Sequence, residues 1–539
     1  MKKIYIIIAG LILLGSCKKD ILDITPTDRL SEDAIWTDIT LPQLFVNAQY
    51  NALQHGMDFD QGITYYGDEA YNQYNIGGYH IVGLNQVNPS NVGGISSFYN
   101  YWGTGYAAIR NLNIFFSKIE ATPIAADVKL KMTAEVKFIR AFIYSKLIWN
   151  YGGVPIVEKL YALNDELKGV QRNSYDECVA YIIKDLDDAI KTLPNQQIGN
   201  DIGRASADAA RALKSRVLLY YASPQNNPTN DKTRWQAASE AALELINSNR
   251  YALYNNYHGL FIGDANTEAI FSRYFSSDNT NFVGKVFAPV GSGGNSFGAP
   301  SQNLVDAYEM KNGVIPVING VLNPDPNNTY DPTDPYVNRD PRFYASILYN
   351  GATYKGRAIQ PFSGGTDGNS QDSSPTGYFN YKFIDQNLVV NDKFAYTYPW
   401  HHFRLAEIFL NYAEAQYNLG SEVNARAYVN RVRARVGVEM PAITVSGTNL
   451  FNAIIHERQV ELAMEGHRFY DVRRLKIAAA VEARPIQGVQ IVRNANGSFS
   501  YTRFNALNKV WNERLYLIPI TFQEIQSSGG SLVQNPGYQ

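Results

Sequence analysis

The chain has 539 residues, with 48 Lys and Arg against 50 Asp and Glu, so its formal net charge is −2. This balance provides no basic surface for a phosphate backbone and argues against a nucleic-acid partner. The two cysteines, Cys17 and Cys178, are too few for a disulfide framework. Aromatic residues make up 13% of the chain and include 38 tyrosines. Many tyrosines must therefore lie partly exposed, where a flat apolar ring with a polar tip suits stacking on sugars or peptides.

The first 30 residues predict export and lipid anchoring. Two lysines precede an apolar run at residues 4–14, which is too short to span a bilayer and fits a signal peptide. The run ends in Leu14-Gly15-Ser16-Cys17, a lipobox in which the cysteine thiol accepts a diacylglyceryl group. We expect residues 1–16 to be removed, Cys17 to be lipidated and residues 17–30 to form a tether. Two or three acyl chains anchor a protein stably.

Residues 31–250 are predicted to form an N-terminal helical region. Apolar residues recur there at helical spacing, with Ser, Thr, Gly and Pro at the boundaries. Small residues such as Ala209 and Ala241 lie where helices must approach closely, which favours stacked helix pairs like those of tetratricopeptide proteins. The expected helices are 31–36, 41–54, 102–119, 129–151, 175–193, 206–223 and 235–249.

Helical periodicity fails between residues 55 and 101, which are rich in Gly, Asn and Tyr. A loop of this length inside a compact protein is usually functional. Its tyrosines either form a stacking platform for a ligand or pack back onto the helices. The candidate ligand-binding residues of this aromatic loop are Tyr65, Tyr66, Asp68, Tyr71, Tyr74 and Tyr79.

Residues 251–401 are predicted to form a loop-rich mixed lobe, because Gly, Pro, Asn and Asp are frequent and helical periodicity is weak. Short runs typical of strands occur at Val283–Val290, Ala345–Tyr349 and Tyr378–Ile384. A second set of candidate ligand-binding aromatics lies in this lobe: Tyr274, Phe282, Phe297, Tyr396 and Trp400.

Residues 402–539 are predicted to return to helices at 404–419, 423–436 and 449–465 before an extended tail at 501–520. Glu457, Glu461 and Glu465 fall on one face of the third helix, where they repel unless cations neutralise them. Nearby arginines offer that charge, so we expect an ion network that docks the helix onto the scaffold, and not a catalytic carboxylate cluster. The expected partners are Arg458, Arg468, Arg473 and Arg474.

Two catalytic motifs are incomplete. His456-Glu457-Arg458-Gln459-Val460 begins like a zinc-protease helix but has Val460 where the second histidine is required. Gly294-Asn295-Ser296-Phe297-Gly298 matches a nucleophile elbow, yet it lies in a flexible Gly- and Ser-rich connection without alternating strands and helices. We expect no metal and no cofactor.

The charged stretch resembles the C-terminal signature of SusD/RagB-type proteins, the surface nutrient-binding lipoproteins of Bacteroidetes outer membranes. The signature residues are Glu457, Arg458, Glu461, Glu465, Arg468 and Asp471, and the resemblance implies that they are structural. Further similar phrases follow in the family's order at 21–27, 338–343, 511–519 and 534–538. The resemblance implies a mainly α fold, with a tetratricopeptide-like helix-pair scaffold and an inserted loop-rich mixed α/β lobe.

The same resemblance implies a surface-exposed outer-membrane lipoprotein that binds oligosaccharides and delivers them, without catalysis, to a SusC-like TonB-dependent transporter. RagB-like members imply peptide as the alternative ligand. A surface glycoside hydrolase is a further alternative, because the separation of two carboxylates in space decides that chemistry and the sequence does not supply it. A purely structural scaffold would have no aromatic platform facing solvent.

Overall fold

The computed structural model describes residues 32–57, 62–161, 167–263, 266–368, 370, 373–387 and 396–538. The predicted signal peptide, the lipidation site Cys17 and the tether at 17–30 lie outside these residues. Among the residues described, no helix is both long enough and apolar enough to cross a membrane.

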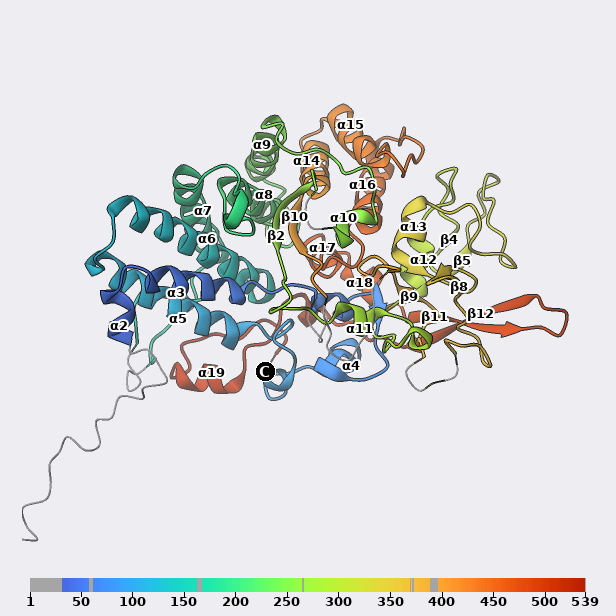
Figure 1. Cartoon of the computed structure of the whole chain (residues 1–539), viewed down its shortest axis with the longest axis horizontal. Coiled ribbons are helices and arrows are strands. Elements are labelled where there is room, and N and C mark those ends of the chain that lie inside the picture. Colours follow the sequence, from blue (N-terminus) through green and yellow to red (C-terminus); the bar gives the residue numbers. More distant parts are fainter. Residues whose placement is uncertain are drawn as a thin grey trace, which may run out of the picture.

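The fold is mainly helical, as predicted, and its long helices pack pairwise along the upper side of the molecule (Figure 1). α6 packs on α7, α8 on α9, and α14 on both α9 and α15. The boundaries follow local signals: the side chain of Ser206 caps α8 by accepting from Ala209 N, and Ser174 forms a capping box with Glu177 at the start of α7. The helices of the scaffold, long and short, are α2 (Glu32–Thr37), α3 (Leu41–Gln49), α5 (Trp102–Lys118), α6 (Ala126–Tyr151), α7 (Tyr175–Thr192), α8 (Ala207–Ala222), α9 (Lys232–Asn247), α14 (Leu405–Asn418), α15 (Glu422–Arg433), α16 (Gly447–Glu461) and α17 (Arg468–Arg474).

The loop-rich lobe has a hydrophobic core of its own beside the main helical core. It contains short helices and two-stranded sheets: α10 (Gly259–Ile262), β2 (Ala269–Arg273), α11 (Val283–Phe287), β3 (Ala299–Pro300), α12 (Gln302–Ala307), β4 (Val317–Ile318), β5 (Val321–Leu322), α13 (Pro341–Ser346), β6 (Ile347–Leu348), β7 (Thr353–Tyr354), β8 (Arg357–Ala358) and β9 (Phe379–Asn380). The chain then returns to the helical scaffold through β10 (Trp400–Arg404), which pairs antiparallel with β2.

Of the three strand predictions for this lobe, one needs correction and the other two need shortening. The run from Val283 to Val290 begins as the helix α11, in which Val283, Val286 and Phe287 are buried at helical spacing. The helix also brings Gly284 against the ring of Tyr396, so closely that no side chain fits there. The other two strand-like runs contribute only two residues each, to β6 and β9, which pair with one another.

The aromatic loop is more structured than predicted. It contains the 3-10 helices η3 (Gly62–Tyr66), η4 (Ile76–Gly78) and η5 (Val92–Gly94), the strand β1 (Ala70–Tyr71) and the helix α4 (Tyr79–Gly83). β1 pairs antiparallel with β3, which joins this loop to the lobe nearly 230 residues later in the chain.

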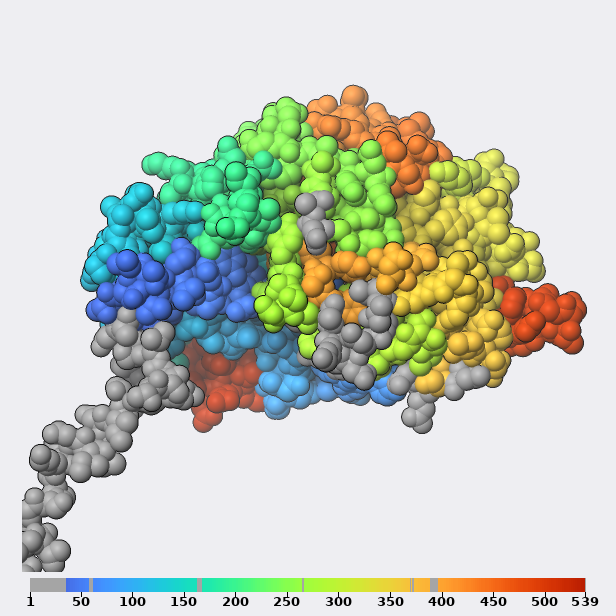
Figure 2. Space-filling model, in the orientation of Figure 1, coloured from blue at the N-terminus to red at the C-terminus, as the bar shows by residue number. Residues whose placement is uncertain are grey.

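The C-terminal part differs from the prediction at two points. α16 ends at Glu461 instead of Glu465, because Met464 and Gly466 both adopt positive φ angles, 62° and 81°, and turn the chain toward α17. The tail forms a hairpin of β11 (Ile486–Arg493) and β12 (Phe499–Leu507), which projects from one end of the molecule (Figure 2). Short helices α18 (Ala478–Glu482) and α19 (Phe522–Ser527) flank it in the sequence.

Candidate functional site

The acidic signature residues form a buried ion-pair network. On α16, Glu461 lies 2.7 Å from Arg404 and 2.6 Å from Arg435. Burial alone would raise the pKa of the Glu461 carboxyl, but these arginines outweigh it and hold that pKa well below its usual range. Glu465, although beyond the end of α16, joins the same network. We call this the α16 network: Glu268, Arg342, Lys382, Arg404, Arg433, Arg435, Glu457, Glu461 and Glu465.

The network uses other cations than those predicted from the sequence. Its arginines come from α13, β10 and the C-terminal end of α15, whereas Arg458 and Arg474 both pair with Asp471, at 3.1 and 2.8 Å. Arg468 pairs with Asp68 at 3.0 Å, and the Arg473 side chain donates to backbone carbonyls. Each acidic signature residue is thus held by arginine, which suits a scaffold. In the described part of the chain, no three His, Cys, Asp or Glu side chains are grouped so that they could hold a metal ion.

Four of the six candidate residues in the aromatic loop are buried, which favours the alternative in which they pack back onto the helices over an exposed platform. Tyr79 packs on Tyr65 and Tyr66, with both ring-centroid distances at 5.0 Å, and Tyr66 Oη donates to Gly77 O at 2.6 Å. Asp68 is only 3% exposed, and its carboxylate anchors the loop to α17 through Arg468. These side chains pack back onto the scaffold and stabilise the loop from within.

The other two loop candidates, Tyr71 and Tyr74, are half-buried and lie beside the pairing of β1 with β3. The Tyr71 ring stacks on the His80 imidazole, with 5.6 Å between centroids and 12° between planes. Tyr74 meets Phe297 edge to face at 5.5 Å. The structure therefore brings two early-loop candidates together with one candidate from the lobe. We call Tyr71, Tyr74, His80 and Phe297 the β1–β3 aromatic group.

The remaining lobe candidates are dispersed. Tyr396 and Trp400 are buried, at 1% and 8% exposure, where Trp400 packs on Phe383 and Tyr396 on Gly284. This burial favours a packing role for both side chains over contact with a ligand. Phe282 is 40% exposed, and Tyr274 is half-buried on a separate surface pocket beside β2.

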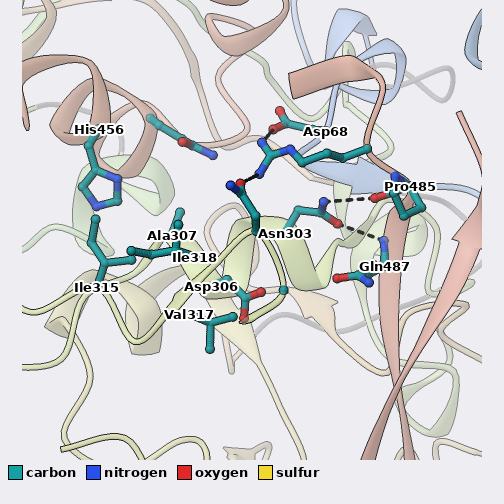
Figure 3. Close-up of a pocket in the computed structure, with 14 residues that line it drawn as sticks. Asp68, Asn303, Asp306, Ala307, Ile315, Val317, Ile318, His456, Pro485 and Gln487 are labelled. Carbon is teal, nitrogen blue, oxygen red and sulfur yellow. Dashed lines mark hydrogen bonds and ion pairs between the residues drawn. The ribbon is translucent and has the colours of Figure 1, made fainter. Parts of the chain in front are cut away.

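A pocket of about 260 Å³ lies next to α12, the helix that begins two residues beyond β3 (Figure 3). Its walls are α12, the β4–β5 hairpin, α16 and the residues that lead into β11. Asn303 ties two of these walls together, because its side chain donates to Pro485 O at 3.1 Å and accepts from Gln487 N at 2.8 Å. The lining offers many hydrogen-bonding groups and a few aliphatic ones: Asp68, Asn303, Asp306, Ile315, Val317, Ile318, Asn319, His456, Gln459, Arg484 and Gln487.

Sequence reasoning missed His80 and, except for Asp68, every residue lining this pocket. The pocket combines segments that are hundreds of residues apart, so no local pattern signals it. His80 follows the candidate Tyr79 directly and lies nine residues after its partner Tyr71. Its position on α4, turned back toward β1, is what makes it a stacking partner.

Comparisons with known proteins match most of the chain to a single family. The model of the SusD family matches residues 259–538, and a model described as starch-binding associating with outer membrane matches residues 22–219. The SusD-like protein P38 of Formosa agariphila is 26% identical over 526 residues, which cover 90% of this chain and 93% of that protein.

Solved structures give the same result. A SusD-like protein from Bacteroides fragilis superposes with a TM-score of 0.80 at 29% identity, covering 95% of this chain and all of the other. A SusD-like carbohydrate-binding protein from the same species gives 0.78 at 23% identity, covering 92% of this chain and 99% of the other, which shows likeness of fold.

Proposed function

Because the chain belongs to the SusD family, we propose that it binds oligosaccharides and passes them on unchanged. The observation that carries this proposal is the β1–β3 aromatic group. A sugar ring has an apolar C–H face and a polar rim, so aromatic rings and hydrogen-bonding side chains bind its two parts separately.

The two ends of the group are held in place before a ligand arrives. The pairing of β1 with β3 fixes the backbone between Tyr71 and Phe297, and each ring is already in contact with a second one. A preorganised surface loses little conformational entropy on binding. The polar pocket of Figure 3 lies next to α12, which begins two residues beyond β3, and it offers carboxylate, amide and guanidinium groups to hydroxyls of a longer glycan.

The proposal includes no bond cleavage. Glycoside hydrolysis needs two carboxyl groups that are available to the scissile bond, one of them as an acid with a raised pKa. The carboxylates of the α16 network are instead buried and paired with arginines, which supports a binding role.

We further propose that the protein acts at the outer membrane, anchored through lipidated Cys17 and facing outward, and that its partner is a SusC-like TonB-dependent transporter. Support comes from the lipobox at Leu14–Cys17 and from the family description that matches residues 22–219, which includes association with the outer membrane.

The test is a binding screen on a chain beginning at Lys18, which retains every described residue. Polysaccharides and peptides are presented by affinity electrophoresis and calorimetry, and each mixture is analysed for products. Glycan binding without released sugar is expected. Binding of peptides alone would replace the ligand class by the RagB-like one, and released sugar would overturn the non-catalytic role.

A further inference from the structure

A second cavity, of about 70 Å³, lies apart from the β1–β3 aromatic group at the junction of the N-terminal helices with the C-terminal region. It is walled by the segments around Gln54 and Gly62, by α6, α8 and β10, and by the turn that leads into α17. The titratable and charged groups facing it are His55, Lys146 on α6, Arg216 on α8, His401 and His402 on β10, and Glu465, His467, Tyr220 and Tyr470.

Several buried polar groups on this cavity have no hydrogen-bond partner among the described residues. They are His402 Nε2, Trp149 Nε1 and Tyr470 Oη, although His402 and Tyr470 are each only 6% exposed. Lys146 Nζ donates to Gln54 Oε1 at 3.0 Å. Burying a polar group without a partner is unfavourable, so several of them around one cavity indicate a missing acceptor.

In the part of the chain that the structure describes, the carboxylates near the cavity are already bound to other cations. Glu407 pairs with Arg216 at 2.6 Å, and Glu465 accepts from Arg404 and Lys382, both at 2.7 Å. Among the described residues, the ammonium group of Lys146 therefore has an amide oxygen as its partner but no carboxylate.

The pKa shifts around the cavity agree with this excess of positive charge. Burial, and then Arg216, lower the pKa of Lys146 to about 7. Burial, and then Arg273 and Lys146, lower the pKa of His55 to about 3. Burial, and then the cationic groups around it, also lower the pKa of His402. An anion would reverse the charge contribution at each of these groups.

We propose that this cavity is a binding site for a small monovalent anion of the size of chloride, held by the Lys146 ammonium group and by the N–H groups of Trp149 and His402. The proposal is independent of glycan binding. A cavity needs about 10–15 Å³ to hold one water molecule. This cavity, of about 70 Å³, therefore has room for one chloride and a few waters. The anion would neutralise Lys146 and join α6 to β10, so that it stabilises the junction between the two helical regions.

Crystallography with bromide in place of chloride tests the location directly. An anomalous difference peak is expected in the cavity, within contact distance of Lys146 Nζ and Trp149 Nε1. Bromide peaks confined to the outer surface, with only water in the cavity, would overturn the proposal.

Thermal unfolding in solution tests the binding energetics with a chain beginning at Lys18. Chloride replaces gluconate at constant ionic strength, and the melting temperature is expected to rise with chloride concentration, because a ligand that binds only the folded state stabilises it. The variant Lys146→Met should lose this dependence. The matched control Lys137→Met, which removes a lysine of the same helix that pairs with Asp188, should keep it.

A second variant keeps the test decisive if Lys146→Met does not fold. Trp149→Phe preserves the ammonium group but removes the indole N–H, and it should weaken the apparent chloride affinity several-fold. Chloride affinity should also fall about tenfold per pH unit above pH 7, as Lys146 loses its proton. Equal responses to chloride in the wild type, Lys146→Met and Trp149→Phe would overturn the anion site.

Discussion

The α16 network and the β1–β3 aromatic group are both dense in residues that serve binding or catalysis, yet their surroundings differ completely. In the network, carboxylates and guanidinium groups are buried and paired with one another. In the aromatic group, the rings stay half-buried and contact one another in pairs beside a short strand pairing. Residue type alone therefore does not distinguish the scaffold from the proposed ligand surface, whereas the exposure of the side chains does.

The largest expected effect comes from breaking the network at its centre. Glu461→Gln removes the charge that Arg342, Arg404 and Arg435 share, and leaves each of these buried guanidinium groups with one carboxylate fewer. Breaking a buried ion pair on one side costs about 3–5 kcal/mol. We expect a loss of this size in the free energy of unfolding, measured by urea denaturation of the full mature chain.

The matched control is Glu422→Gln, which removes a carboxylate that pairs with Arg426 on the surface of α15. Its urea midpoint should stay close to that of the wild type, since exposed ion pairs contribute little. If Glu461→Gln were as stable as this control, the network would not be the scaffold we describe.

The second largest effect is a pH dependence of the stability, which arises at the boundary between the α16 network and the β1–β3 aromatic group. Glu69 precedes β1 and is buried, and burial together with the neighbouring Asp68 carboxylate raises the pKa of Glu69 to about 8. The folded protein thus retains a proton that the unfolded chain releases above pH 4.5, so this site's contribution to stability falls as the pH rises from about 4.5 to 8. Glu69→Gln removes this pH dependence. The free energy of unfolding of the variant should therefore rise, relative to that of the wild type, by a few kcal/mol between pH 4.5 and 8.

Urea denaturation of both proteins at pH 5.5, 7.0 and 8.5 measures this difference. It should widen in favour of Glu69→Gln up to pH 8 and then level off. Glu240→Gln, which removes an exposed carboxylate from α9, serves as the control for the loss of a surface charge. A constant difference for Glu69→Gln would contradict the raised pKa.

The helical scaffold could be predicted because its signals are local. Apolar spacing, the cap at Ser206 and the small residues between helix pairs each act within a few residues. The ion-pair partners within the α16 network could not be predicted from the sequence, since Arg342 and Glu457 meet across 115 residues of chain. Val283–Val290 shows the same limit, because a short apolar run fits a strand as well as a buried helix until its packing against Tyr396 is known.

The candidate site was predicted in part for the same reason. Tyr66 and Tyr71 lie five residues apart in similar sequence, and only long-range packing decides that one ring is buried and the other half-buried. The sequence supplies the right residue type in both positions. It does not supply β3, which comes from the lobe and pairs with the strand that holds Tyr71.

Truncating the half-buried rings should weaken binding and leave folding intact. Tyr71→Ala and Tyr74→Ala are each expected to raise the Kd for a glycan found in the binding screen about tenfold, which corresponds to roughly 1.4 kcal/mol. Calorimetry measures the change. The control is Phe522→Ala, which removes an exposed ring from α19, away from β1 and β3, and should leave the Kd unchanged. Unchanged binding in both tyrosine variants would remove the β1–β3 aromatic group from the proposal.

The smallest expected effect is on stability and comes from a buried tyrosine, Tyr66, in place of a half-buried one. Tyr66→Phe keeps the buried ring but removes the hydroxyl that donates to Gly77 O at 2.6 Å. Since a net intramolecular hydrogen bond contributes about 1 kcal/mol, the free energy of unfolding should fall by about that amount. The glycan Kd should stay within twofold of the wild type, because the ring that holds the loop in place remains. If Tyr66→Phe weakened binding as much as Tyr74→Ala while losing no stability, the buried tyrosines would contact ligand, and burial in the free protein would no longer separate scaffold from site.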